Sequence, residues 1–366
     1  MDKKFTVLIA GGGTGGHLYP AIAIGESMYT KYPNINVHYI GSKFGIEATV
    51  LPVKALQHTL LPIRGFQRGY SLQSLIRNSL LPWRLYNSMR IARKTIKMLK
   101  PDIIVGTGGY ASAIPLKTAV KWNIPIILQE QNSYPGITTK YFAEKAKQIC
   151  IAFEAARTEL KANTVLTGNP IRANIQNGDR QIGGLLFDLN PDQKTIFLFG
   201  GSQGSAFLNK IMNECISMFD SEKIQVLWQT GPNQYDQYKH LNSSIVKVRS
   251  FIHNMPEAYA ISDLIISRAG ALTLSEITAC GKPSILVPFL HSAGDHQTKN
   301  AKSLEDAKAA ILLSEKDLTP RKLYRSAIGV LYDDNKLESM SNNSKSLGEQ
   351  DATEKIVDQI LKVIIN

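Results

Sequence analysis

His17 is the side chain of this sequence best placed to move a proton, because it directly follows a glycine-rich turn. The turn reads Gly11-Gly12-Gly13-Thr14-Gly15-Gly16, and residues typical of a helix follow from Ala21. Glycines let a backbone bend sharply and approach a ligand, and the N–H groups at a helix start favour an anion. A neutral imidazole beside such a ligand can act as a general base on a hydroxyl. A histidine that caps or packs the turn is the other interpretation, and the residues alone leave the two even.

Four more polar side chains lie where strands or turns end, and each could contact a sugar or a nucleotide. Asn132 and Gln297 carry amides that suit sugar hydroxyls. Glu276, in the second turn of an expected helix, could accept hydrogen bonds from a ribose diol, and Arg172 follows a Gly-Asn-Pro turn. Each of the four also fits an ordinary place on a surface or a helix, and the sequence leaves this open.

The elements that must position these residues repeat the order strand, turn, helix. Apolar runs predict strands over 5–10, 37–40, 103–106 and 124–128. This alternation predicts an α/β fold with a parallel sheet and helices on both faces. Because ligands of such sheets collect beyond the carboxyl ends of the strands, we expect the polar clusters to meet at that edge.

The pattern starts again in the second half of the chain. A strand over 195–199 leads into a third glycine turn and a helix, while 176–193 is expected to be irregular. We therefore expect two similar domains, over 1–167 and 168–346, that face each other across a cleft. The remaining segment, 347–366, contains an amphipathic helix with Ile356 and Ile360 facing inward.

Several common sites are not favoured. Gly11-x-Gly13-x-x-Gly16 matches a dinucleotide fingerprint, but the second strand ends in Gly41-Ser42-Lys43, where the carboxylate that would hold the ribose is missing. The sequence has no P-loop and no His, Cys or acidic cluster with metal-ligand spacing, so it requires no metal and no cofactor. The three cysteines are isolated and fit a reducing compartment.

The positive charge is concentrated in the first half. Residues 1–170 hold 21 Lys and Arg against 8 Asp and Glu, and 64–100 holds nine basic residues and no acid. Such a surface favours an anionic partner, which could be nucleic acid, a phosphate compound or an acidic lipid face. A nucleic-acid site would need interleaved aromatic platforms or a known module, and neither is found.

These residues resemble the MurG family of glycosyltransferases over nearly the whole chain. The similarity lies in seven motifs in family order: Gly12–Ala21, Gly106–Tyr110, Gln129–Asn132, Gly168–Arg172, Gly200–Gly204, Ser267–Glu276 and Asp295–Ala301. The resemblance implies a GT-B fold, with two Rossmann-like domains and a C-terminal helix that crosses back to the first. It also implies transfer of N-acetylglucosamine from UDP-N-acetylglucosamine to the muramyl sugar of lipid I, which makes lipid II for peptidoglycan.

The resemblance also implies roles for single residues. Arg172, Ser202 and the Ile252 backbone would hold the uracil end of the donor, and Glu276 the ribose. The helix start at Ala271, Leu272 and Thr273 would hold the diphosphate, and Leu274 and Ser275 would also contact substrate. Gln297 and Asn132 would contact the N-acetylglucosamine, and Thr14, Gly15 and Gly16 would close from the acceptor side. His17 would be the base of an inverting displacement, with Glu130 as a second candidate for catalysis.

A lipid acceptor implies work at the cytoplasmic face of the membrane as a peripheral protein, beside other enzymes of cell-wall synthesis. The expected patch for an anionic membrane surface surrounds Pro82 and consists of Leu75, Ile76, Leu80, Leu81 and Trp83, with Arg77 and Arg84. Ordinary core packing is the alternative for its apolar residues. Other functions remain open: a UDP-N-acetylglucosamine 2-epimerase or a diacylglycerol glycosyltransferase of the same fold, a nucleotide-sugar binder without turnover, and a nucleic-acid-binding protein.

Overall fold

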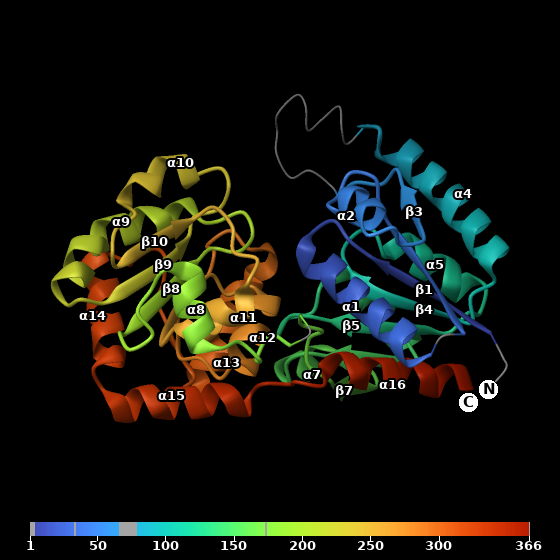
Figure 1. Cartoon of the computed structure of the whole chain (residues 1–366). Coiled ribbons are helices and arrows are strands. Elements are labelled where there is room, and N and C mark those ends of the chain that lie inside the picture. Colours follow the sequence, from blue (N-terminus) through green and yellow to red (C-terminus); the bar gives the residue numbers. More distant parts are fainter. Residues whose placement is uncertain (1–3, 33, 66–78, 173, 366) are drawn as a thin grey trace. The chain divides into compact units, whose positions relative to one another are not determined.

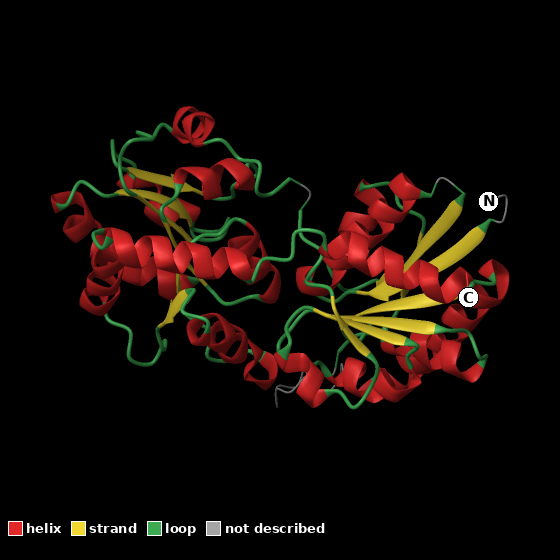
Figure 2. Cartoon of the chain, turned by 90° about the horizontal axis from the view of Figure 1, so that it is seen from below, coloured by secondary structure: helices red, strands yellow, loops and turns green. Residues whose placement is uncertain are grey.

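The computed structural model describes residues 4–32, 34–65, 79–172 and 174–365 (Figure 1). The chain forms two compact units, of which the first contains Met1–Ile171 and Asp351–Asn366 and the second contains Arg172–Gln350. The predicted α/β class with two Rossmann-like domains is confirmed, because each unit holds one parallel sheet covered by helices on both faces (Figure 2).

Unit 1 has a seven-stranded sheet with the order β3-β2-β1-β4-β5-β6-β7. The strands are β1 (Phe5–Gly11), β2 (Ile35–Ser42), β3 (His58–Leu61), β4 (Ile103–Gly108), β5 (Ile126–Glu130), β6 (Gln148–Ile151) and β7 (Thr164–Leu166). The helices are α1 (Gly15–Lys31), α2 (Glu47–Val53), α4 (Leu81–Leu99), α5 (Ala113–Lys121), α6 (Ile137–Phe142), α7 (Ala155–Glu159) and α16 (Ala352–Ile365).

Alternate residues of β1 divide the core of unit 1 into two layers. Val7 and Ile9 pack with α1 and α16, whereas Leu8 and Ala10 pack with α4 and α5. The C-terminal helix thus completes the core of the first unit, with Ile356 fully buried as the periodicity predicts. Because β1, β4 and β5 are neighbours, the first two glycine turns and the polar cluster after β5 come together at one edge.

Unit 2 has a six-stranded sheet with the order β10-β9-β8-β11-β12-β13. The strands are β8 (Thr195–Phe199), β9 (Gln225–Gln229), β10 (Val246–Arg249), β11 (Leu264–Ser267), β12 (Ser284–Leu286) and β13 (Ala310–Leu312). The helices are α8 (Arg180–Phe187), α9 (Ala206–Ser221), α10 (Tyr235–Tyr238), α11 (Met255–Ile261), α12 (Ala271–Ala279), α13 (His296–Asp306), α14 (Pro320–Leu331) and α15 (Asp334–Ser346).

Two expectations about local structure are wrong. Helix α8 lies within 176–193, which was expected to be irregular. The Asp179 side chain caps its first turn. Gly183 lets the helix pack closely on α11, since a Cβ at this position would lie 2.8 Å from the Glu257 carbonyl oxygen. Helix α1 starts at Gly15 and not at Ala21, because the Leu18 N–H already bonds back to the Thr14 carbonyl. The earlier start places the last two glycines of the turn in the first helical turn.

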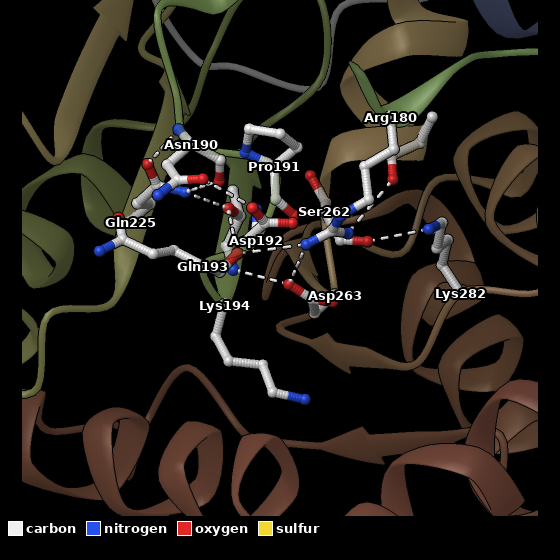
Figure 3. A network of polar contacts seen from close by, with 12 residues as sticks. Arg180, Asn190, Pro191, Asp192, Gln193, Lys194, Gln225, Ser262, Asp263 and Lys282 are labelled. Atoms are coloured by element: carbon white, nitrogen blue, oxygen red, sulfur yellow. Dashed lines mark hydrogen bonds and ion pairs between the residues drawn. The ribbon is translucent and has the colours of Figure 1, made fainter. Parts of the chain in front are cut away.

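A network of polar contacts joins the segments at the amino-terminal edge of the unit 2 sheet (Figure 3). The Arg180 guanidinium donates to the carbonyl oxygens of Pro191 and Gln193 and to the Asp263 carboxylate, at 2.7–3.1 Å. The Lys282 ammonium donates to the Ser262 carbonyl oxygen at 2.8 Å. A cavity of about 270 Å³ lies beside these two cations, but both are turned to protein acceptors, so the network is structural.

Candidate active site

The His17 side chain is fixed by the ends of two neighbouring strands. Its Nδ1 lies 3.0 Å from the Thr107 carbonyl oxygen near the end of β4 and 3.1 Å from the Gln131 Oε1 directly after β5. Both partners are acceptors, so the hydrogen-bond network assigns the ring proton to Nδ1. The Nε2 atom of the neutral ring then carries a lone pair, which is what a general base needs.

Gln131 is oriented by its own contacts, and sequence reasoning did not single it out. Its amide nitrogen donates to the Thr107 carbonyl oxygen at 2.7 Å and to the Gln129 side chain, which turns its oxygen towards His17. The Thr107 hydroxyl in turn donates to the His17 carbonyl oxygen at 2.9 Å. The place of Gln131 in a motif of amides after a strand was the available signal.

The glycine turn at the end of β4 lies against the His17 ring, and two of its positions require glycine. Gly108 and Gly109 have φ values of +92° and +76°, a region that side chains rarely adopt. A Cβ at Gly108 would lie 2.8 Å from the His17 Nδ1, and one at Gly109 would lie 2.2 Å from the Gly12 carbonyl oxygen. The two glycine turns therefore pack directly on each other around the imidazole.

A carboxylate does reach the end of β2, contrary to the expectation from the sequence. Glu47, at the start of α2, is fully buried and accepts from the Gly13 N–H at 2.9 Å and the Ser42 N–H at 2.7 Å. The Glu47 carboxylate therefore occupies the Gly13 N–H, a backbone donor that the phosphate of a dinucleotide would need. Among the described residues, the N–H groups of Gly15 and Gly16 have no acceptor, so they remain available to an external anion.

Glu130 organises the loop after β5. Its buried carboxylate accepts from the backbone and the side-chain amide of Asn132, at 3.1 and 3.2 Å, and from the Gly136 N–H at 3.0 Å. These contacts set the position of Asn132, which directly follows the His17 partner Gln131. The contacts of the Glu130 carboxylate are thus made with its own loop.

In unit 2, Arg172 and Glu276 are brought together, although more than 100 residues separate them in the sequence. The Arg172 Nε lies 3.4 Å from the Glu276 carboxylate, which also accepts from the Tyr259 hydroxyl at 3.1 Å. Burial raises the pKa of Glu276 above its ordinary value, and Arg172 opposes this shift. Burial also raises the pKa of Tyr259, which therefore stays a hydrogen-bond donor.

The start of α12 offers backbone donors. Of the five residues predicted to contact substrate here, three have open N–H groups, and the other two form contacts within the protein. The N–H groups of Ala271, Leu272 and Thr273 have no acceptor among the described residues, as expected for an uncapped helix start. The Leu274 side chain is fully buried and its N–H bonds to Gly270, so we place it in the core. The Ser275 hydroxyl donates to the Ala271 carbonyl oxygen at 3.1 Å.

The remaining donor-site candidates lie on loops near this edge of the sheet. Ser202 is exposed in the turn after β8. The Ile252 N–H donates to the Gln229 side chain at 2.8 Å, and Gln229 also donates to Gly201, so one amide links the two loops. The Gln297 side-chain oxygen, in the first turn of α13, accepts from the Phe289 N–H at 2.9 Å.

Arg268 was missed by the sequence reasoning, although it lies within a quoted motif. Its buried guanidinium forms an ion pair with Glu315 at 2.7 Å and donates to Ser205, the N-cap of α9, and to the carbonyl oxygens of Val287 and Pro288. It joins the loops after three strands at their carboxyl ends. A basic residue directly after a buried strand was the signal in the sequence.

The predicted membrane patch is described in part, because Leu75, Ile76 and Arg77 lie outside the described residues. Leu80 and Trp83, at the start of α4, are 44% and 63% exposed, and Leu81 and Arg84 are half-buried. Leu85, on the next turn of this helix, is 46% exposed. The helix packs on α5 and β3 through later residues such as Ala92 and Ile96, so its first turns keep apolar surface exposed.

Within the described ranges, no helix is long and apolar enough to span a bilayer, and no three His, Cys or acidic side chains gather as a metal site would require.

Comparison with known proteins covers both units. Residues 7–151 match the glycosyltransferase family 28 N-terminal domain, and residues 195–356 match the family 28 C-terminal domain. A Parabacteroides distasonis protein is 38% identical over 99% of both chains and is named UDP-N-acetylglucosamine–N-acetylmuramyl-(pentapeptide) pyrophosphoryl-undecaprenol N-acetylglucosamine transferase.

Two solved structures indicate how far the similarity extends. The crystal structure of Acinetobacter baumannii MurG superposes with a TM-score of 0.78 and 26% identity, covering 98% of this chain and 99% of that one. A UDP-N-acetylglucosamine 2-epimerase superposes with a TM-score of 0.61 and 16% identity, covering 98% and 96%. The second similarity shows the shared fold alone.

Proposed function

Because the chain belongs to glycosyltransferase family 28 and, within it, to the MurG family, we infer that it is an N-acetylglucosaminyltransferase. It moves N-acetylglucosamine from UDP-N-acetylglucosamine to the muramyl sugar of lipid I, and the product is lipid II for peptidoglycan synthesis. The full-length match to relatives named for this reaction carries the inference. The His17 network supplies a base for the same chemistry.

In the proposed reaction, the acceptor hydroxyl attacks the anomeric carbon of the donor as UDP leaves with the bonding electrons. The Nε2 atom of His17 takes the hydroxyl proton, and the Nδ1–H bond to Thr107 holds the ring and stabilises the imidazolium that forms. Gly15 and Gly16 offer N–H groups to an anionic part of the acceptor.

Unit 2 is proposed to hold the donor. Glu276 would accept from the ribose hydroxyls, with Arg172, Ser202 and the Ile252 loop around the uracil end. The open N–H groups at the start of α12 would bind the diphosphate and stabilise the charge on departing UDP. These donors supply the electrostatic stabilisation that a metal ion provides in other transferases, so we propose that no resident metal is required.

We further propose that the protein binds the cytoplasmic face of the membrane as a peripheral protein. The exposed apolar start of α4 carries Leu80 and Trp83, and Arg84, Arg90 and Arg93 follow on the same helix. Each basic residue near an anionic surface contributes about 1 kcal/mol to binding. Apolar insertion together with basic attraction suits an enzyme whose acceptor is a lipid.

Replacing Leu80 and Trp83 with glutamate should lower binding to anionic vesicles by about tenfold or more, because two apolar contacts are lost and two negative charges are added. Binding of UDP should stay within twofold. The matched control is Ile182→Glu with Leu185→Glu, which changes two exposed apolar residues of α8 in unit 2. Vesicle co-sedimentation measures the effect, and equal binding by both double variants contradicts the membrane proposal.

The inferred function is tested by transfer of labelled N-acetylglucosamine from its UDP donor to a lipid I analogue. We expect a labelled lipid product and stoichiometric UDP. Formation of the 2-epimer of the donor in place of this product would identify an epimerase. Binding of UDP without release of any product would identify a binding protein.

A further inference from the structure

Three cationic groups surround one aromatic ring of unit 1. The Arg64 and Arg84 guanidinium carbons lie 4.0 and 5.3 Å from the centroid of the Phe44 ring, and the Lys43 Nζ lies 5.1 Å from it. We name these four residues the Phe44 cluster. Each cation is attracted to the ring, but three like charges so close together also repel one another.

The cluster has unused capacity for an anion. Among the described residues, none of its three cations forms an ion pair. The Nε of Arg64 is buried and has no hydrogen-bond partner within the described part of the chain. The nearest acid in the sequence, Glu47, is occupied by the N–H groups of Gly13 and Ser42. A buried donor without an acceptor is costly, so binding of an anion that supplies an acceptor would be favourable here.

The backbone holds the cluster in place. After β2, the Lys43 N–H donates to the Leu61 carbonyl oxygen at 2.9 Å, and the Phe44 N–H donates to the Ser42 hydroxyl at 3.0 Å. The same hydroxyl donates to the Ile63 carbonyl oxygen at 2.6 Å. These bonds fix the turn after β2 to the chain after β3, and Arg64 therefore stands beside Phe44.

The cluster lies next to the glycine turn that precedes His17. The Tyr110 ring packs against this turn and against the residue after Arg64, since a Cβ at Gly13 would lie 2.7 Å from this ring and one at Gly65 would lie 3.2 Å from it. Glu47 makes a second link, because its carboxylate bonds to Gly13 in the turn and to Ser42 beside the cluster. The cations and the open N–H groups of the α1 start thus belong to one edge of unit 1.

We propose that the Phe44 cluster binds the diphosphate of the lipid-linked acceptor. The proposal rests on the function inferred above and names the residues that recognise the anionic part of its acceptor. A diphosphate carries several negative charges and acceptor oxygens close together, and guanidinium groups bind such oxygens two at a time. A phospholipid headgroup offers the same phosphate chemistry, so the test must separate the two sources.

The test compares Arg64→Gln, Arg84→Gln and their double variant with Lys97→Gln, which removes an exposed charge from the same helix, α4. Transfer is measured with a detergent-solubilised lipid I analogue and no vesicles. Each single change should raise the acceptor KM about tenfold, since a charge-assisted contact is lost, and kcat should stay within about twofold. Arg64→Lys, which keeps the charge, should recover part of the loss, and Lys97→Gln should behave like the unaltered chain.

Inorganic pyrophosphate serves as a probe that does not depend on turnover. Calorimetry is done in saturating UDP, which fills the proposed donor site at the start of α12. It should show that pyrophosphate binds the unaltered chain and Lys97→Gln, and that binding is lost in the double variant. If the unaltered chain transfers no sugar but binds pyrophosphate through the cluster, the inferred function fails and the anion site stands. Where Arg64→Gln lowers the melting temperature, Lys43→Gln replaces it, because Lys43 is exposed.

Two results would overturn the proposal. An unchanged acceptor KM in the double variant excludes the acceptor diphosphate as the ligand. If binding to anionic vesicles without acceptor falls while the acceptor KM is unaltered, the cluster recognises phospholipid headgroups.

Discussion

Replacing His17 with alanine is expected to lower kcat for sugar transfer by about a thousandfold, within the range found when a general base is removed. The Nδ1 atom of His17 is held by Thr107 and Gln131, so the lone pair on Nε2 is fixed in direction before any substrate binds. Loss of the imidazole removes the acceptor for the hydroxyl proton. The affinity for UDP should change less than twofold, because the proposed donor residues belong to the other unit.

The variant His17→Gln separates catalysis from packing. A glutamine amide can still donate to the Thr107 carbonyl oxygen and fill part of the space, but it cannot take a proton at neutral pH. If His17 is the base, His17→Gln and His17→Ala lose similar activity. If His17 only supports the turn, His17→Gln recovers most of the turnover and the assignment of the base to His17 is wrong.

Replacing Glu276 with glutamine is expected to weaken binding of the UDP donor by about 30-fold, because charge-assisted hydrogen bonds to the ribose are lost. The comparison of UDP with 2′-deoxy-UDP makes the test specific. The change should weaken UDP much more than the deoxy compound, which lacks one of the hydroxyls. Glu214→Gln, an exposed site on α9, is the control. Equal losses for both nucleotides would show that Glu276 does not contact the ribose.

The same variant should be more stable than the parent chain at neutral pH. Burial raises the pKa of Glu276 in the folded state, so the ionised carboxylate costs stability when the pH lies above this pKa. The cost disappears as the pH falls below the ordinary glutamate value, where the group is neutral in both states. Denaturant unfolding should therefore show a gain for Glu276→Gln at pH 7 that vanishes near pH 4. A loss at pH 7 that persists near pH 4 would indicate a purely structural role.

Donor binding by the parent chain should respond to pH in the opposite direction. As the pH falls through the raised pKa of Glu276, the protonated carboxyl loses acceptor capacity and UDP affinity should decrease. A Glu276 that costs stability and supplies affinity in these experiments would have the character of a functional-site residue.

The sequence alone determined the fold class and the edge on which the candidate site lies. Apolar strands followed by glycine turns fix a parallel sheet, and neighbouring strands of such a sheet end at one edge. The place of His17 beside a glycine turn and the uncapped helix start at Ala271 are also local properties. The same holds for the inward face of α16, where the spacing of Ile356 and Ile360 was sufficient.

Only the tertiary structure decided which distant groups complete the site. Glu47, at the start of α2, bonds back to the end of β2 and to the first glycine turn. Gln131 directs its side-chain oxygen towards His17, and Arg172 forms an ion pair with Glu276, more than 100 residues away in the sequence. The position of Arg64 beside Phe44 likewise depends on hydrogen bonds between two loops. Sequence patterns report periodicity along one element, whereas these contacts depend on side-chain direction and strand order, which exist only in the packed fold.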